Sequence, residues 1–445
     1  MSEPSTVATP EPEWAAFAAI DWGDQKNFWR LVPAGSQRHE HGELENTPEA
    51  VEVWAATLQQ RFGGRKIAVC LEQSRGALVY MLAKYEHLVL FPVHPTTAAR
   101  YRETFRTSGA SDDPSDAASL LDLLLRHRET LRELRPDTKE TRLLQFLVEE
   151  RRRMVDEKTR QGNRLTGWLK LYFPQIPHWF EEVSGPLVGD LLERWPSLGE
   201  LQRAHPGTLH QFFHQHNCRG EERIQERIRA IYQAMPATQD AAVLEAGPMI
   251  ARGLVVLLAA LRKQIEVCEK RIEELVQSHP DGALFGSLPG AGAALVPRLI
   301  VAFGTQRDRY QSAYQLQCYS GIAPVKEASG KTQWVHCRFI CPKFLRQTFH
   351  EFASHSIGQS EWAKAYYDHL RKDEKKSHHA AVRALGYKWI RIIYRCWQDR
   401  KPYDEEVYMQ SLRRRGSLLG GALGLATDAG WKTVAGFKKL SEKKA

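Results

Sequence analysis

The sequence predicts an α/β domain followed by a mostly helical remainder, and three observations support this prediction. Short apolar runs alternate with helical patterns over residues 14–130. After residue 131, apolar residues recur every three or four positions, which is typical of long helices. Gly and Pro turns separate the elements in both parts. At about 100–200 residues per domain, the 445-residue chain is long enough for roughly two to four domains.

The first domain, residues 14–130, is expected to contain a mixed sheet. Its elements follow the order of three strands, helix, strand, helix, strand and helix. A hairpin-rich start followed by β-α units is typical of the RNase H-like fold, in which helices cover the sheet. The strands are expected at 14–21, 27–32, 38–44, 66–72 and 88–93, and the first two helices at 48–62 and 76–85.

Two of the apolar runs end abruptly in a single acid. Asp21 closes the first run, and Glu72 closes the run at 66–72. A carboxylate at the end of a buried strand is costly unless it is hydrated, paired or bound to a metal. Because functional sites gather at the carboxyl ends of parallel strands, we expect Asp21 and Glu72 to lie together and to bind a divalent metal.

A second pair of acids, Asp113 and Asp116, lies three residues apart. On a helix this spacing places both on one face, where they could complete a magnesium site. The same residues suit a helix start, with Asp113 as the N-cap, Pro114 as the first helical residue and Asp116 in the first turn. The local sequence leaves both interpretations open, and Asp112 competes with Asp113 as the third metal ligand.

The composition is that of a globular protein with a basic surface. Hydrophobic residues make up 42% and charged residues 26% of the chain, and the net charge is +9 with a pI of about 9.1. A basic balance favours a polyanionic partner such as DNA or RNA, although an ordinary excess of surface Lys and Arg also produces it.

The cysteines and the N-terminus indicate a cytoplasmic protein. Seven cysteines are dispersed without a Cys-x-x-Cys pair, so we expect reduced thiols and no zinc site. Residues 1–13 have neither a basic start nor an apolar core, so we expect a disordered tail rather than a signal peptide. No uninterrupted apolar stretch is long enough to span a membrane, so no membrane partner is expected.

Residues 131–283 are expected to form a helical, coiled-coil region with an insertion at about 174–250. One seam repeats in alternating steps of four and three, at Leu254, Leu258, Leu261, Ile265, Cys268, Ile272 and Leu275. This spacing predicts a coiled coil between chains, and hence a dimer or tetramer, but a helical hairpin within one chain has the same pattern. The insertion carries short helices near 186–195 and 221–235, and no function can be assigned to it.

A mostly helical C-terminal domain is expected at residues 284–408, followed by a basic tail at 409–445. Its Leu288-Pro-Gly-Ala-Gly292 element lies between two helical patterns. Such glycines either expose backbone N–H groups to a DNA phosphate or make a tight interhelical turn. A loop is expected at 323–332, and helices are expected near 342–356, 361–372 and 378–397.

The expected loop contains a serine that could act as a nucleophile. Ser329 precedes Gly330, so its hydroxyl is expected to be exposed in a turn. A hydroxyl near a magnesium-bound phosphate can attack phosphorus, and a plain Ser-Gly loop is the alternative. The nearby residues of interest are Glu327, Trp334 and His336, together with the expected nucleic-acid contacts Lys331, Arg338, Lys343 and Arg346.

In order and spacing, these elements resemble those of the DEDD transposases of bridge-RNA-guided insertion sequences, the IS110 group, over roughly residues 15–400. The shared elements are Asp21, Glu72, Asp113-x-x-Asp116-Ala, Leu288-Pro-Gly-Ala-Gly292, Tyr319-Ser-Gly-Ile-Ala-Pro324 and Ala328-Ser329-Gly330. Each motif alone is weakly specific, whereas the ordered set is specific. The sequence departs from the family where Ser111-Asp112 replaces the usual Lys-Thr or Lys-Asn before the third acid.

The resemblance implies a RuvC-like N-terminal domain, a coiled-coil middle and a C-terminal transposase domain. It implies that Asp21, Glu72, Asp113 and Asp116 form an acidic quartet, and that Ser329 makes a covalent phosphoserine link to DNA. It further implies a structured guide RNA, called bridge RNA, that pairs with donor and target DNA. Family members assemble as dimers of dimers, in which the acids and the serine of one active centre come from different subunits.

The sequence therefore predicts an RNA-guided DNA recombinase of a mobile element that requires Mg²⁺ and acts in the bacterial cytoplasm, associated with the nucleoid. Serine attack would conserve the phosphodiester energy, so that strands could be rejoined without ATP. Two alternatives are a RuvC-like nuclease that hydrolyses branched DNA with water and a non-catalytic protein that bridges nucleic acids.

Overall fold

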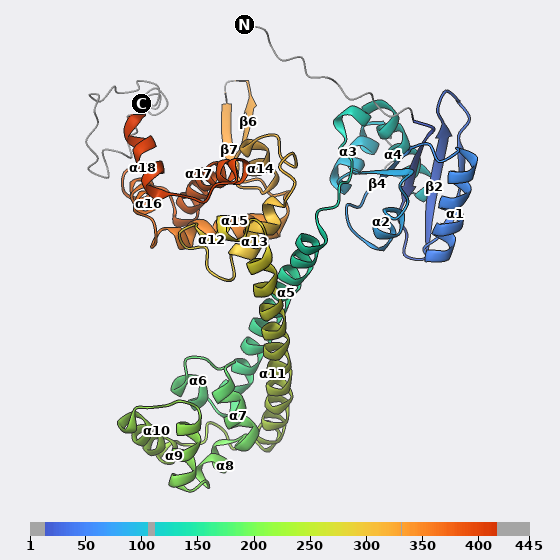
Figure 1. Ribbon diagram of the computed structural model, residues 1–445. Helices are drawn as coiled ribbons and strands as arrows, with labels where there is room; N and C mark the ends of the chain where they lie inside the picture. The colour runs from blue at the N-terminus through green and yellow to red at the C-terminus, as the bar shows by residue number, and fades with distance from the viewer. Residues whose placement is uncertain (1–13, 106–111, 331, 416–445) are drawn as a thin grey trace. The chain divides into compact units, whose positions relative to one another are not determined.

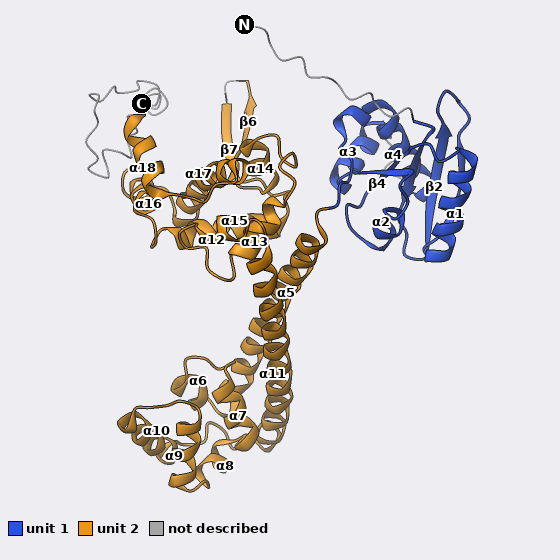
Figure 2. Ribbon diagram, viewed as in Figure 1, with its two compact units in different colours: residues 1–136 blue, residues 137–445 orange. Residues whose placement is uncertain are grey.

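The computed structural model describes residues 14–105, 112–330 and 332–415. The chain divides into two compact units, residues 1–136 and 137–445, which are coloured separately in Figure 2. The expected N-terminal tail, residue Lys331 and the basic tail beyond residue 415 lie outside the described residues.

The first unit contains a five-stranded mixed sheet with the order β3-β2-β1-β4-β5. Strands β1 to β3 are antiparallel, and β4 and β5 run parallel to β1. The strands are β1 (Ala16–Asp21), β2 (Lys26–Pro33), β3 (Glu40–Glu45), β4 (Ile67–Leu71) and β5 (Leu88–Pro92). All five expected strands are confirmed, and the topology agrees with the predicted RNase H-like domain.

Helices cover both faces of this sheet, because its strands alternate between two apolar cores (Figure 1). Ala18 and Ile20 of β1 belong to the core that includes α1 and α2, whereas Ala19 belongs to the core that includes α3 and α4. The bounds are α1 (Pro48–Arg61), α2 (Ala77–Leu82), α3 (Pro95–Phe105), α4 (Asp113–His127) and the short 3-10 helix η1 (Arg128–Thr130).

The second unit is organised around two long antiparallel helices, α5 (Lys139–Tyr172) and α11 (Ala241–Ser278), which lie side by side in Figure 1. At one end Thr141 and His279 are joined by a 3.1 Å side-chain hydrogen bond. At the other end, a Cβ added to Gly247 would lie 2.5 Å from the ring of Tyr172, so glycine permits close packing there.

The predicted seam of α11 is used within the chain. Leu254, Leu258, Ile265, Ile272 and Leu275 are buried, and α11 packs on α5 and on α7 (Pro186–Arg194). The helical-hairpin interpretation therefore describes this seam, whose other two residues, Leu261 and Cys268, are half-buried.

The insertion forms a small helical core of its own against the ends of α5 and α11. The two short helices that the sequence predicted there are confirmed as α7 and α10. The remaining bounds are α6 (Gln175–Trp179), α8 (Leu198–Gln202), α9 (Pro206–Gln215) and α10 (Glu221–Gln233).

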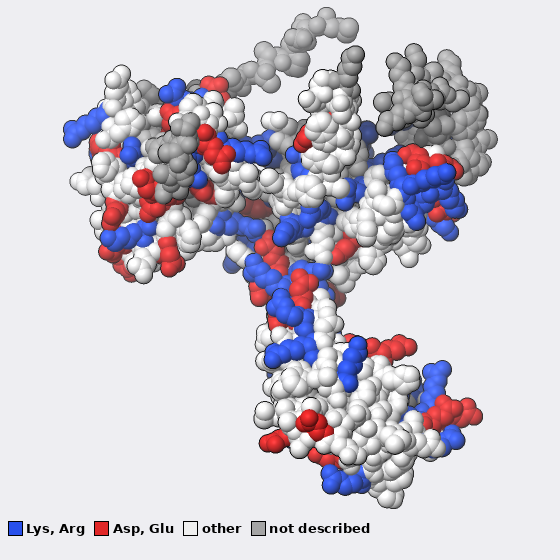
Figure 3. All heavy atoms as spheres, turned by 180° about the vertical axis from the view of Figure 1, so that it is seen from behind, with Lys and Arg blue, Asp and Glu red and all other residues white. Residues whose placement is uncertain are grey.

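Charges of both signs cover the paired long helices. Arg152 forms ion pairs with Asp156 (3.2 Å) and with Glu351 (3.5 Å), and Arg151 pairs with Glu269 across the two helices. Figure 3 accordingly shows Lys and Arg interspersed with Asp and Glu on this part of the molecule, rather than a continuous basic stripe.

Helix α11 is also long and apolar enough, by length and composition, to cross a membrane. Its buried residues pack into the cores of the second unit, as in a core helix of a globular protein. Its outer face is nevertheless apolar: Met249 is 70% exposed and Val256 is 65% exposed.

The C-terminal part is mostly helical, as predicted, and surrounds the largest buried cluster of the unit. The helices are α12 (Gly282–Gly286), α13 (Val296–Phe303), α14 (Ala313–Tyr319), α15 (Lys343–Ser356), α16 (Glu361–Lys372), α17 (His378–Asp399) and α18 (Glu405–Arg414). Helix α18 crosses the expected start of the basic tail at residue 409, so residues 409–414 are helical.

The glycine element between α12 and α13 has a packing role. Gly290 has a φ of +81°, and a Cβ there would lie about 3 Å from the backbone of His355 and Ser356 at the end of α15. The close approach of two backbones therefore explains this glycine, which favours the tight-turn interpretation over phosphate binding.

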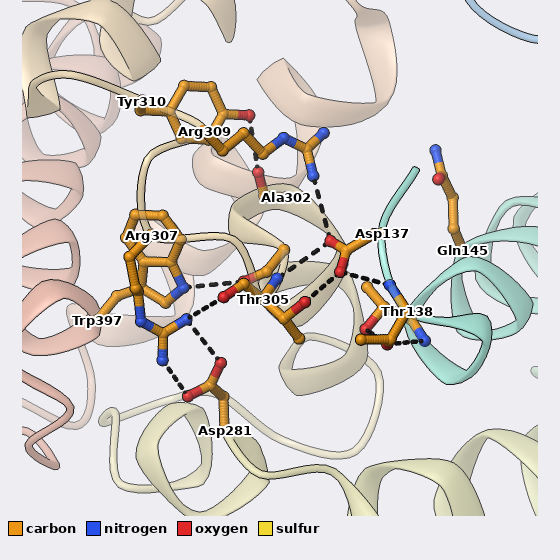
Figure 4. A network of polar contacts seen from close by, with 12 residues as sticks. Asp137, Thr138, Gln145, Asp281, Ala302, Thr305, Arg307, Arg309, Tyr310 and Trp397 are labelled. Carbon is orange, nitrogen blue, oxygen red and sulfur yellow. Dashed lines mark hydrogen bonds and ion pairs between the residues drawn. The ribbon is translucent and has the colours of Figure 1, made fainter. Parts of the chain in front are cut away.

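A polar network fixes the start of α5 to the C-terminal part (Figure 4). The Asp137 carboxylate accepts hydrogen bonds from the backbone N–H (3.0 Å) and the hydroxyl of Thr305. Arg307 pairs with Asp281, just beyond α11 (2.9 Å), and lies 4.7 Å from the ring centroid of Trp397. The network thereby holds both long helices against the loop that follows α13.

Candidate active site

The sheet brings the first two predicted acids together. Ile20 of β1 pairs with Leu71 of β4 in parallel register, so Asp21 and Glu72 occupy the next position on neighbouring strands. Alternation along the strands places both side chains on the face covered by α4, with Ala19 and Cys70. Asp21 is the last residue of β1, and Glu72 directly follows β4.

The second pair of acids lies in the first turn of α4, which packs on β1. Asp112 is the N-cap, since its carboxylate accepts a 2.8 Å hydrogen bond from the backbone N–H of Ser115 in a capping box. Asp113 is the first helical residue and Asp116 lies one turn along. The expected alternative, with Asp113 as the cap, is therefore wrong, because Asp112 fills that position.

The four acids influence one another electrostatically. Burial, together with the negative charges of Asp116, Glu72 and Asp113, raises the pKa of Asp21 to about 7. Burial and Asp116 also raise the pKa of Glu72, while Arg102 opposes this. The same four acids were selected from the sequence.

An arginine partly balances this charge. Arg102 of α3 forms an ion pair with Asp116, and both side chains are largely shielded from solvent. Among the described residues, no three His, Cys, Asp or Glu side chains lie close enough to share one metal ion as placed. The donor set still fits a divalent cation chemically, because it consists of clustered carboxylates whose charge Arg102 only partly compensates.

The predicted loop around Ser329 is instead a two-stranded antiparallel hairpin, β6 (Val325–Ser329) and β7 (Thr332–His336). Ser329 pairs with Thr332 beside the turn, and Gly330 in that turn has a φ of +56°. The loop prediction is therefore wrong. The strands could not be recognised from the sequence, because both are exposed and lack the apolar alternation that marks a half-buried strand. Exposure of Ser329 is confirmed.

The described basic residues do not surround the serine. His336 pairs with Val325 at the other end of the hairpin, about 13 Å from the Ser329 end at roughly 3.4 Å per residue. Arg338 follows that far end, and its carbonyl oxygen accepts a 3.4 Å hydrogen bond from Arg346. Lys343 is exposed at the start of α15.

Sequence reasoning missed one aromatic residue just beyond this hairpin. The ring of Phe339 stacks on His336 with centroids 6.1 Å apart and planes 17° apart. Trp334 and Glu327, which the sequence singled out without a role, face each other across the two strands. The Gly330-Lys331 pair in the sequence, two residues between potential strands, was the available signal for the hairpin.

An RNase H-like domain with clustered acids, joined to a helical domain that exposes a serine, defines an enzyme that processes phosphodiester bonds. Comparisons with known proteins agree. A family model described as a transposase, of the IS110 DEDD type, matches residues 18–174, and one described as the IS116/IS110/IS902 transposase family matches residues 282–368. The chain belongs to the IS110 family of DEDD transposases, enzymes that act on DNA and generally use divalent metal ions.

Similar proteins support this assignment. The chain is 28% identical to a Streptomyces coelicolor protein named as the mini-circle transposase for IS117, over 76% of the chain and 83% of that protein. It is 26% identical to the 43.6 kDa protein of insertion element IS110 from the same organism, over 88% and 96%. It is 24% identical to the 42 kDa protein of IS900 from Mycobacterium paratuberculosis, over 88% and 97%.

Proposed function

We propose that this transposase is an RNA-guided, site-specific recombinase that cuts and rejoins donor and target DNA through a phosphoserine at Ser329. The observation that carries the proposal is the coexistence of two features: four neighbouring carboxylates, two at strand ends and two in the first turn of α4, and an exposed serine beside a hairpin turn. Family membership favours an enzyme over the non-catalytic bridging protein considered from sequence.

Asp21, Glu72, Asp113 and Asp116 would hold Mg²⁺. A bound Mg²⁺ supplies charge neutralisation of the non-bridging phosphate oxygens. The protein fixes two of these carboxylates at strand ends and two in the first turn of α4. Asp116 would exchange its pairing with Arg102 for the ion, while Asp112 remains the helix cap.

Ser329 supplies the nucleophile. Its Oγ forms a bond to phosphorus as the bond to the departing sugar oxygen breaks, and the serine proton leaves while that sugar oxygen takes up a proton. In the rejoining step a sugar hydroxyl attacks the phosphoserine and restores the serine hydroxyl. One phosphodiester is thus exchanged for another without an external energy source.

A guide RNA and two DNA molecules are the proposed nucleic-acid partners, and the +9 charge suits a protein whose affinity depends on phosphate contacts. RNA guidance rests on the family resemblance. Sequencing RNA that copurifies with the protein should recover a structured transcript from DNA flanking the gene; recombination in its complete absence would contradict guidance. The site of action is the DNA of the bacterial cytoplasm.

A homo-oligomer, a dimer or tetramer, is proposed to form through the outer face of α11. Exposed small and apolar residues repeat there in steps of four and three, at Met249, Gly253, Val256 and Ala260, opposite the buried seam. Val256→Asp should lower the mass measured by light scattering, whereas Val407→Asp, at a similarly exposed position, should not. An unchanged mass for Val256→Asp would contradict this interface.

Trapping tests the serine. Wild-type protein, guide RNA and DNA should yield a protein–DNA adduct on denaturing gels, and Ser329→Ala should yield neither adduct nor recombinant. Thr332→Ala, across the hairpin, is the matched control and should retain both. Recombination by Ser329→Ala would remove the serine from the mechanism, and cleavage without any adduct would favour the nuclease that uses water.

A further inference from the structure

Ser329 shares one face of its hairpin with several side chains that have no role so far. In an antiparallel pair, directly opposed residues and their second neighbours point to the same side. The pairs Ser329–Thr332, Glu327–Trp334 and Val325–His336 therefore lie on one face. Val335, the neighbour of Trp334 in the chain, lies on the opposite face and is 65% exposed.

Polar contacts hold this face in place. His336 Nε2 lies 2.8 Å from a carboxylate oxygen of Glu327, and Nδ1 lies 2.9 Å from the carbonyl oxygen of Cys337. Both ring nitrogens thus meet acceptors, which suits the protonated imidazole. The hydrogen bond from His336 lowers the pKa of Glu327. The Glu327–His336 pair therefore joins β6 to β7 on this face.

Two aromatic rings remain open to solvent along this face. Trp334 is 44% exposed, and Phe339, stacked on His336, is 76% exposed. Figure 1 shows the hairpin projecting from the helices of the C-terminal part. Exposed aromatic rings offer flat apolar faces that a partner with its own flat apolar surface can cover.

The charge around the rings selects the chemistry of that partner. Residues 328–350 contain no Asp or Glu but include Lys331, Arg338, Lys343 and Arg346. Aromatic faces near these cations match single-stranded nucleic acid, which offers phosphates and base faces together, and the acid on this face, Glu327, is paired with His336. In an intact duplex the base faces cover one another, so only an unpaired base could cover these rings.

We propose that Trp334 forms a stacking platform for an unpaired DNA base next to the phosphate that Ser329 attacks, and that Phe339, beside His336, extends this platform away from Ser329. Diagonal neighbours on such a face, here Ser329 and Trp334, lie about 7–8 Å apart, within reach of an aromatic side chain. The stacked base therefore belongs to a nucleotide adjoining that phosphate. The platform positions the strand and rests on the proposed role of Ser329.

The test combines protein and DNA variants in the full chain with its guide RNA. After the attacked phosphate is mapped from the wild-type adduct, each adjoining base is replaced by an abasic site. Trp334→Ala should slow adduct formation about tenfold on intact DNA. One abasic substrate should itself form the adduct more slowly with wild-type protein, and on that substrate Trp334→Ala should cause no further loss of rate. Trp334→Phe should retain most of the rate, and Val335→Ala, on the other face, should match wild type.

The outcomes separate this inference from the proposed function. If the wild-type adduct forms but Trp334→Ala forms it at the normal rate, the platform is wrong. The platform is also wrong if Trp334→Ala lowers the rate on the slow abasic substrate by the same factor as on intact DNA. If Trp334→Ala changes the oligomeric mass instead, the face contacts a second copy, and the platform is also wrong. If wild type forms no adduct, the serine proposal fails; equal binding of gapped DNA with and without the base would then overturn the platform as well.

Discussion

The acidic site and the serine hairpin are built on opposite kinds of structure. Asp21 and Glu72 lie at the ends of mostly buried strands, whereas β6 and β7 are exposed along nearly their entire length. The carboxylates of the acidic site are charged although they are partly buried. A substitution that changes the chemistry of this site should therefore also change the stability of the fold. The hairpin carries the proposed nucleophile, Ser329, outside any core. A substitution of Ser329 should therefore change the chemistry without changing the stability of the fold.

The largest expected effect is on catalysis at the acidic site. Asp21→Asn should lower recombination by about a thousandfold, because it removes a charged ligand of the proposed metal ion. Recombinant products on a two-plasmid assay provide the measurement. Asp24→Asn, three residues along and exposed, is the control and should remain active. Normal recombination by Asp21→Asn would exclude this carboxylate from the active site.

The second-largest expected effect is on stability, which a substitution in the acidic site should change and a substitution in the hairpin should not. The pKa of Asp21 is raised from 3.8 to about 7 in the folded protein, so the folded state loses stability relative to the unfolded state as pH rises through this range. Without metal at pH 8, Asp21→Asn should stabilise the protein by about 1–2 kcal/mol, after discounting for solvent screening.

This gain should be largely lost at about pH 4, near the ordinary pKa of the group, and should disappear below that, where the carboxyl group becomes protonated in both states. Ser329→Ala should leave the unfolding midpoint unchanged at either pH, because its side chain is exposed. Chemical denaturation followed by circular dichroism measures both variants. A stabilisation by Asp21→Asn of equal size at pH 4 and pH 8 would contradict this account.

Arg102 offers a smaller, directional test. Arg102→Gln removes the cation paired with Asp116, so a divalent ion no longer competes with a guanidinium group. The apparent affinity for Mn²⁺, measured by the metal-induced thermal shift, should rise by roughly threefold to tenfold. Arg100→Gln, exposed on the same helix, should bind as wild type. Weaker binding by Arg102→Gln would mean that the arginine supports the metal site.

The smallest effect concerns the hairpin turn. Gly330 has a φ of +56°, and its missing Cβ would meet open space, so Gly330→Ala adds backbone strain of about 1 kcal/mol without a clash. Hydrogen exchange should quicken for the amides of β6 and β7 but remain unchanged for β4. A matching change in β4 would show that the hairpin is coupled to the core after all.

Burial also determined which features could be predicted from the sequence. The apolar runs before Asp21 and Glu72 predict their strands, because buried strands carry an unmistakable composition. The exposed β6 and β7 carry no such pattern, so the hairpin and Phe339 were missed. Asp112 and Asp113 could not be separated, since capping depends on backbone geometry. The α11 seam predicted a partner helix but could not specify that α5 of the same chain fills that role.

The pairing of α5 with α11 has a consequence for how the length of this hairpin can be changed. These helices carry the chain out to the α6–α10 core and back, along a seam that repeats every seven residues. Deleting seven residues from each would keep the packing in phase while shortening the hairpin by about 10 Å. The hairpin is thus an adjustable spacer, whose length can change in matched steps while the substructures at its two ends stay intact.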